Sequence, residues 1–561
     1  MPTPTKILIS PDRGREETLP GKKQQPLLQF ALVLTGCIVA GLGTVIWICR
    51  DNIRLLASWH GFLHTAIANQ FAVFSFPPEN PFFAGETLPY YWLYHFAGYW
   101  LSRLLGLDLL HTFHLISGLS LIVFIVFALL IGRTYCRSTL AGVMIAWLGL
   151  AGLNPLGPGI ALAKHFTRGV VLEKSLDKSP VETTFVSNAV SDDLMTEPLL
   201  PAMYVGSDWR YGQSLMWFFD IASRAPALAL LMALIYLLLK PEGGWRHYAL
   251  VGGVSLLVTA FSALIGLSVA AALVFARRRL FAACLTGALL ALPTYYQMFF
   301  RISGGGGVAL SRYWALAAGA MILNFLILGP LALAGARKSQ TGMLGLAGLL
   351  MLLVVVAIDL PEGNEHNIAN AAQCLLAVPA GAAVAGSGRW RRVLAMSLFA
   401  AFLPVTVCTL QAYALRPSMP LGTVGRTLHR LPADSDLEQL YRWIRRDTTA
   451  NSIFVIDPSS PVKMSGNVSE LPAFTGRALF TDLPNYLTTP NRDARLRAEL
   501  AGEAIEGKAL NAQQRQYLMG FHRPVYVLSH HADRSDLRDR LSGLYGSAKF
   551  QQGSVAVFQI P

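Results

Sequence analysis

The residues best suited to chemistry lie in two short stretches near the N-terminus, HGFLH and PPENPFFAGETLPYYWLYH. A carboxylate or an imidazole can take the proton from a hydroxyl group, so Glu86, Glu79 and His60 are candidate catalytic bases. For either glutamate the simpler alternative is a solvated loop in which neighbouring prolines only shape a turn. His60 and His64 also have the i, i+4 spacing of a helical metal pair, but no third ligand is in register.

Cationic side chains that could hold an anion occur further along the chain. A guanidinium group binds two phosphate oxygens at once, which suits a phosphorylated ligand. Four arginines outside the predicted cytoplasmic loops meet this description: Arg168, Arg210, Arg224 and Arg312. Arg224 follows Asp220 by four residues in an apolar run, so the two could instead form a structural ion pair on one helical face.

The composition indicates that membrane-spanning helices must position these side chains. Of 561 residues, 53% are hydrophobic and only 14% are charged, whereas soluble domains carry about a quarter charged residues. The net charge of +13 comes from Lys and Arg in short runs between apolar stretches. This is the pattern of cytoplasmic loops, and it excludes nucleic-acid binding as the main function. The six cysteines lie in or beside apolar segments, which predicts neither a disulfide framework nor a zinc cluster.

Apolar runs and loop charges together predict a mostly α-helical, polytopic membrane protein with about eleven transmembrane helices between residues 28 and 415. A bilayer core about 30 Å thick needs about 20 apolar residues per helix. The predicted helices cover 28–49, 111–132, 138–155, 213–239, a hairpin of two short helices in 247–276, 280–297, 313–335, 341–358, 366–387 and 393–415. With the tail 1–27 cytoplasmic, the arginine-containing loops lie inside, including the loop around Cys136, and 50–110 and 156–212 form outer loops.

The segment YYWLYHFAGYWLSRLLGL, residues 90–107, is long and apolar enough to compete as a further span. Counting it as a span would invert every later loop and place the arginine runs outside. Its six Tyr and Trp residues suit the headgroup region, where amphipathic rings gather. The charges therefore predict an interfacial or re-entrant helix.

The sequence beyond Pro417 has the composition of a soluble domain, and residues 420–561 are predicted to form a small extracytoplasmic α/β domain. DSDLEQLYRWIRRDT predicts a helix, with an acidic or hydroxyl cap and an apolar face. SIFVIDP and PVYVLSH predict buried strands, and AKFQQGSVAVFQI predicts a closing hairpin.

Several of these motifs together are similar to a known family. HGFLHTAIANQF, PPENPFFAGETLPYYWLYH, an outer EGNEH opening a late helix and LYRWIRRDTTANSIFVIDP resemble the GT-C superfamily of membrane glycosyltransferases, in particular a bacterial branch with a tyrosine-rich first loop. The resemblance implies transfer of a sugar from a polyprenyl-phosphate donor at the outer face of the bacterial inner membrane. In the family an acid near the end of the first helix acts as base or contacts the acceptor, and the position aligned with it here is His60.

The resemblance also implies a set of substrate contacts on the outer face. We assign them to His64, Tyr90, Tyr91, His95, Arg168, Arg210, Arg224, Glu365 and His366. The expected partners are the lipid-linked donor, a glycan, lipid or protein acceptor, and membrane lipids. No cofactor is predicted, and a divalent metal is left open. The first-loop acids and the segment 359–366 are expected to border one cavity.

Three other functions compete with this interpretation. A polymerase or ligase of lipid-linked glycans would also use outer-loop arginines. A transporter would show inverted repeats or broken helices at mid-membrane, and no convincing repeat is present in the sequence. A catalytically silent membrane subunit that holds its α/β domain for a partner would explain why His60 stands where the family has an acid.

Overall fold

The computed structural model describes residues 59–73, 77–88, 90–156, 213–219, 221–241, 243–274, 278–295, 309–311, 314–336, 341–360, 365–385, 388–413, 436–456, 463–464, 468–482, 492–531 and 533–561. The predicted first transmembrane helix and nearly all of the loop 156–212 lie outside these ranges. Four of the residues named above also lie outside them: Arg168, Arg210, Asp220 and Arg312.

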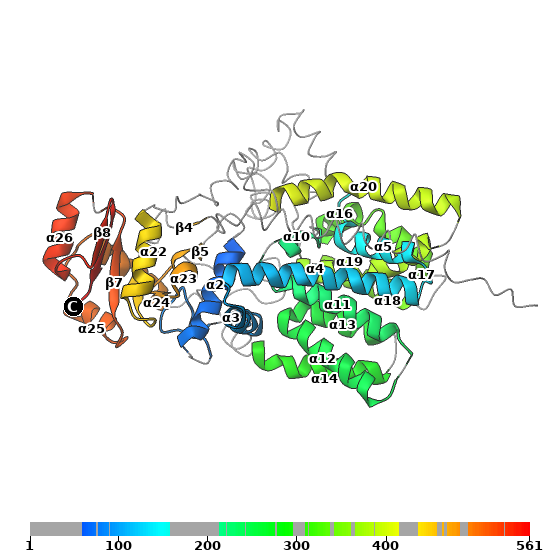
Figure 1. Cartoon of the computed structure of the whole chain (residues 1–561), viewed down its shortest axis with the longest axis horizontal. Helices are drawn as coiled ribbons and strands as arrows, with labels where there is room; N and C mark the ends of the chain where they lie inside the picture. The colour runs from blue at the N-terminus through cyan, green and yellow to red at the C-terminus, as the bar shows by residue number, and fades with distance from the viewer. Residues whose placement is uncertain are drawn as a thin grey trace, which may run out of the picture. The chain divides into compact units, whose positions relative to one another are not determined.

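Helices make up most of the described chain before residue 414 (Figure 1). Those that follow the predicted spans closely are α4 (Leu109–Thr134), α5 (Thr139–Ala151), α12 (Trp245–Phe261), α13 (Ala263–Val274), α14 (Arg278–Ala291, continued by the 3-10 turn η5, Leu292–Tyr295), α18 (Gly342–Ala357), α19 (Glu365–Val384) and α20 (Arg389–Tyr413). Among the described residues, α4 and α19 are long and apolar enough to cross a bilayer alone. The total of eleven spans stays a prediction.

Two predicted spans are interrupted. The run 213–239 divides into α10 (Met216–Phe219) and α11 (Arg224–Leu239), and the run 313–335 divides into α16 (Trp314–Asn324) and α17 (Leu328–Ala336). The second pair bends by 70°. Pro330 lies in the first turn of α17, where a missing N–H is tolerated, but continuing α16 through it would remove a backbone hydrogen bond. Apolar length alone predicted one helix because it does not register such breaks.

Helix α19 lies at the centre of the helical part, packed against α5, α17 and α18. Small residues permit the close approach: a Cβ on Gly335 of α17 would overlap the carbonyl of Pro379 in α19, and a Cβ on Gly381 would overlap the side chain of Ile145 in α5. Such small-residue contacts are typical of helix packing within membranes.

The first outer loop contains two helices, α2 (Trp59–Asn69, followed by the 3-10 turn η2, Gln70–Val73) and α3 (Leu93–Leu105). Thirteen residues of α3 rise only about 20 Å, too short to cross the bilayer core. The exposed large side chains Phe96, Trp100 and Leu104 lie four residues apart, on one face of α3. This geometry favours the interfacial placement, which stays a prediction.

A five-stranded sheet of order β6-β3-β7-β9-β8 forms the C-terminal part. Its strands are β3 (Ile453–Val455), β6 (Ala478–Leu479), β7 (Val525–Ser529), β8 (Phe550–Gln552) and β9 (Val555–Gln559). The helices of this part are α22 (Asp436–Asp447), α23 (Leu471–Thr475), α24 (Arg492–Ile505), α25 (Ala512–Met519) and α26 (Ser535–Tyr545); two-residue strands elsewhere are β1 (Ala309–Leu310) with β2 (Ile358–Asp359), and β4 (Lys463–Met464) with β5 (Val468–Ser469). β3 runs parallel to β6 and β7, while β8 and β9 form the predicted antiparallel hairpin.

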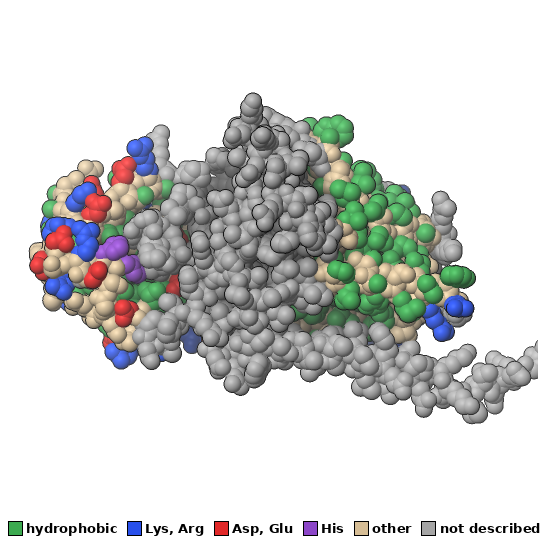
Figure 2. All heavy atoms as spheres, turned by 90° about the horizontal axis from the view of Figure 1, so that it is seen from above, with side chains coloured by type: hydrophobic (Ala, Val, Ile, Leu, Met, Phe, Trp, Pro, Cys, Tyr) green, Lys and Arg blue, Asp and Glu red, His purple; other side chains and the backbone are tan. Residues whose placement is uncertain are grey.

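The first outer loop and the C-terminal sheet share one hydrophobic core. Phe62 of α2 and Phe82 belong to the same buried cluster as Tyr441 of α22 and Phe454 of β3. Asn69 of α2 also donates to two carbonyls of α23, at 2.8 and 3.2 Å. Figure 2 shows charged side chains over the C-terminal part and hydrophobic side chains over the helices, as a lipid-facing surface requires.

Candidate active site

A pair of buried histidines lies between α2 and α3. Nδ1 of His64 and Nε2 of His95 are 2.7 Å apart, and the two residues are 1% and 0% exposed. In this hydrogen bond one nitrogen donates and the other accepts, so at least one ring is neutral. Burial lowers the pKa of His95 to about 3, which keeps its ring uncharged at neutral pH. His95 is therefore the neutral ring of the pair.

A short chain of hydroxyl groups runs beside the histidines. Tyr90 donates to the oxygen of Tyr91 at 2.9 Å, and the hydroxyls of Tyr91 and Ser223 are 2.6 Å apart. The ring of Tyr91 lies 5.8 Å from that of His95, centroid to centroid. Burial raises the pKa of Tyr91, so its hydroxyl remains protonated. Ser223 precedes α11, so this chain joins the first outer loop to the helical part.

Arg224, the first residue of α11, extends the polar cluster. Its guanidinium lies over the ring of Trp217 of α10, 3.9 Å from the centroid. The indole N–H of Trp217 donates to Asn370 of α19 at 2.7 Å, and its ring lies 5.2 Å from that of His366. The next residue back, Glu365, accepts a short hydrogen bond from the backbone N–H of Leu360. Elements α10, α11 and α19 thus meet at buried polar groups.

These interactions connect most of the residues that were predicted to bind substrate. His64, Tyr90, Tyr91 and His95 lie together, Arg224 follows Ser223, and His366 is reached through Trp217. Whether the first-loop acids share one cavity with the segment 359–366 stays a prediction. Among the described residues no group of three or more His, Cys, Asp and Glu could hold a metal ion.

The three candidate bases occupy different environments. Oε1 of Glu79 accepts from the backbone N–H of Gly85 at 2.6 Å and pairs with Arg523 at 2.5 Å, which gives this carboxylate a structural task. Glu86 is half-buried, and its backbone bonds to Asn80 and Phe83. His60 lies in the first turn of α2, and its side chain is outside the described set. The geometry favours Glu86 over Glu79.

Several polar residues of the cluster were not predicted. Trp217, Ser223 and Asn370 are among them, and Gln373 joins three segments by accepting from Ser214 at 2.6 Å and donating to the carbonyl of Leu148 at 2.9 Å. A signal was present in the sequence: Asn367, Asn370 and Gln373 recur every three residues within an otherwise apolar run.

Comparison with protein-family models finds no match, and comparison with curated proteins finds none either. Solved structures do match. The structure of ArnT from Cupriavidus metallidurans bound to undecaprenyl phosphate is 12% identical in sequence, with a TM-score of 0.50, and the match covers 94% of this chain and 98% of that one. The same protein in the apo state matches with a TM-score of 0.51 over the same shares.

Proposed function

We propose, from the premise that this chain has the GT-C fold of membrane glycosyltransferases, that it transfers a sugar from a polyprenyl-phosphate donor to an acceptor hydroxyl at the outer face of the inner membrane. The observation that carries the proposal is the buried polar cluster from His64 to His366. Buried ionisable groups in a membrane protein are costly and are usually retained for function.

The donor class is proposed from the charge of the cluster and from the fold. A lipid-linked phosphate needs a cation near the membrane surface, and Arg224 lies where the first outer loop meets α11. Its guanidinium can bind two phosphate oxygens. The structural match that contains undecaprenyl phosphate supports this choice of ligand. Arg168 and Arg210 are proposed as additional phosphate contacts.

The proposed chemistry is an inverting displacement at the anomeric carbon. The acceptor oxygen forms the new glycosidic bond, the bond from the anomeric carbon to the phosphate oxygen breaks, and polyprenyl phosphate leaves with the electron pair. Glu86 takes the acceptor proton, with His60 as the other candidate. Tyr90, Tyr91 and the histidine pair line the same outer region and are proposed to orient the sugar by hydrogen bonds.

A second candidate, a catalytically silent subunit, is supported by two observations. Glu79 is held by Arg523 and by the N–H of Gly85, and His60 stands at the position of the family's acid. Of the two candidate glutamates, this leaves Glu86 as the proposed base. If Glu86 has no catalytic task, the loop supports structure alone.

The test is to incubate the purified full-length protein in lipid nanodiscs with a panel of polyprenyl-phosphate sugars and candidate acceptors. We expect release of polyprenyl phosphate from one donor, and a decrease of about 10²- to 10⁴-fold in turnover for Glu86→Gln with donor binding retained. Glu79→Gln and His60→Ala are measured separately. Full turnover in all three variants would remove the first outer loop as the source of the base, and no turnover with any donor would favour the silent subunit.

A further inference from the structure

Residues 77–88 of the first outer loop fold into a small hairpin, here called the first-loop hairpin. Glu79 and Thr87 form an antiparallel bridge, and the N–H of Leu88 donates to the carbonyl of Pro78 at 2.9 Å. Inside it, the N–H of Asn80 donates to the carbonyl of Glu86 at 2.8 Å. The backbone of Glu86 is therefore fixed by the hairpin itself.

The first-loop hairpin covers the edge of the C-terminal sheet. Leu479 of the edge strand β6 donates its N–H to the carbonyl of Pro81 at 2.8 Å and accepts from the N–H of Ala84 at 2.8 Å. Backbone groups on an edge strand otherwise face solvent or another chain. Ala84 also belongs to a hydrophobic cluster of the C-terminal part. The contact is thus built by both backbone and side chains.

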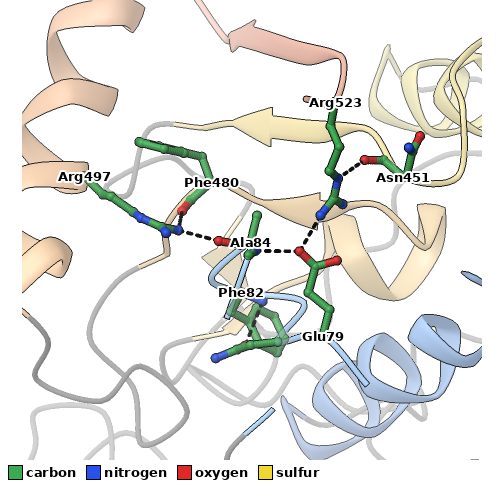
Figure 3. Close-up of polar contacts among 9 residues, drawn as sticks. Glu79, Phe82, Ala84, Asn451, Phe480, Arg497 and Arg523 are labelled. Atoms are coloured by element: carbon green, nitrogen blue, oxygen red, sulfur yellow. Dashed lines mark hydrogen bonds and ion pairs between the residues drawn. The ribbon is translucent and has the colours of Figure 1, made fainter. Parts of the chain in front are cut away.

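Arg497 of α24 reaches this contact from the left in Figure 3, with its guanidinium directed at Phe480 and Ala84. Its Nη1 donates to the carbonyls of Ala84 at 2.7 Å and Phe480 at 2.9 Å, and its Nε donates to the hydroxyl of Tyr517 at 2.9 Å. The guanidinium lies over the ring of Phe83, 3.9 Å from the centroid. Two of these four partners come from the first-loop hairpin.

The charge of Arg497 is informative because the side chain is only 4% exposed. Within the described ranges no carboxylate forms an ion pair with it, so carbonyl oxygens and aromatic faces replace its water. Burying a cation in this way costs free energy that an apolar side chain would not. The hairpin's carbonyl and ring offset part of that cost, so the seated hairpin and the buried cation stabilise each other.

An ion pair holds the other side of the first-loop hairpin (Figure 3). Arg523 pairs with Glu79 and also donates a short hydrogen bond to the carbonyl of Asn451. Between the two contacts lies Gly85, whose φ of +81° disfavours other residues. A Cβ at Gly85 would lie 2.8 Å from Cε1 of Phe521. The first-loop hairpin can therefore pack in this position only if residue 85 has no side chain.

We propose that Arg497 is a positioning residue of the site: it seats the first-loop hairpin on the C-terminal sheet and thereby fixes Glu86 and, directly after the hairpin, Tyr90 and Tyr91. This inference rests on the proposed function. The C-terminal sheet then takes part in the transfer reaction by holding the loop that carries the base, without touching either substrate.

The experiment uses the full-length protein in nanodiscs with Arg497→Gln, Arg497→Lys and the matched control Arg495→Gln. Arg495 lies two residues away on α24, 90% exposed, and pairs only with the neighbouring Glu499 among its described contacts. We expect Arg497→Gln to lower kcat about 10- to 100-fold with little change in donor KM, because misplacing a reacting group by about 1 Å can cost as much. Arg497→Lys keeps the charge but loses the planar guanidinium, so its kcat should lie between those of Arg497→Gln and the wild type. The kcat of Arg495→Gln should equal that of the wild type.

Hydrogen exchange at the amides of Ala84 and Leu479 gives a readout that does not need activity. We expect protection there to fall in Arg497→Gln and to persist in Arg495→Gln. If Arg497→Gln does not fold, Gly85→Ala displaces the same hairpin from the loop side and should give the same loss of kcat and protection. The positioning role would be overturned if the variant lost protection at these amides but kept its kcat. It would also be overturned if protection did not change. A wild type that is protected but transfers no sugar would instead show that the proposed function has failed.

Discussion

At the scale of single residues, burial decides what His64 and His95 can do. A charged imidazole between α2 and α3 would have no water around it, so the pair is held together by one proton in a hydrogen bond of 2.7 Å. Helix α3 is not among the described helices long enough to span a bilayer. A neutral imidazole such as that of His95 has one donor and one acceptor nitrogen, which suits hydrogen bonding to hydroxyl groups.

The first prediction concerns acid stability. The folded pKa of His95 is about 3 against 6.5 for the ordinary side chain. Between these values the unfolded chain binds the extra proton, so stability is lost as the pH falls below about 6.5. At pH 5 the loss from His95 is about 2 kcal/mol. We expect His95→Asn to reduce the difference in thermal stability between pH 7.5 and pH 5. An unaltered pH dependence in His95→Asn would contradict the predicted cause.

Residue types in the site could be predicted from the sequence, but their pairing could not. His64 and His95 were both named because imidazoles recur in an aromatic stretch, yet nothing in a spacing of 31 residues specifies a hydrogen bond. Glu79 was one of three candidate bases, and no local pattern predicts that Arg523, 444 residues away, pairs with its carboxylate. Contacts between distant segments depend on the tertiary fold, which local patterns do not encode.

At the scale of elements, the sequence predicted helices better than their interruptions. Hydropathy and loop charge located the long runs because one apolar helix needs nothing else to satisfy its backbone in lipid. The irregular segment that leads into α10 needs partners from elsewhere, and Gln373 of α19 accepts from Ser214 there while donating to the carbonyl of Leu148 in α5. A polar residue in an apolar helix can therefore indicate a neighbouring irregular segment whose backbone or side chains it satisfies, as well as a bound ligand.

This gives the second prediction, on Gln373→Leu. The substitution keeps apolar packing volume but leaves the Ser214 hydroxyl without its amide partner, while the Leu148 carbonyl keeps the N–H of Gly152. A buried polar group that loses its partner costs about 1–3 kcal/mol. We expect a clear fall in the thermal unfolding temperature in detergent. Ser120→Ala is the control, because that hydroxyl bonds only within its own helix, to the carbonyl of Ile116 at 2.7 Å. Equal unfolding temperatures for the two variants would count against a joining role for Gln373.

At the scale of the whole molecule, the C-terminal sheet and the first outer loop must lie on the same side of the membrane, because they share a hydrophobic core and the ion pair of Glu79 with Arg523. The loop charges predict which side. Arg133 in the last turn of α4 and Arg137 after it flank Cys136, and Arg389, Arg391 and Arg392 begin α20. Cytoplasmic loops carry such an excess of arginine. Both groups are therefore predicted to lie inside and the sheet outside.

The last prediction tests this topology with reporters that are active on only one side of the membrane. A reporter enzyme that folds only outside the cytoplasm should be active when fused after Pro561 and inactive when fused after Arg137; a cytoplasm-specific reporter should give the opposite result at both positions. A third fusion after Asp108 separates the two interpretations of α3. If α3 lies at the interface, this fusion reports outside, as the C-terminal fusion does. If α3 crosses the bilayer, Asp108 reports inside, Arg137 reports outside and the charge-based orientation is wrong. The result does not depend on how far α3 is buried in the protein, because each reporter responds to the compartment in which it folds.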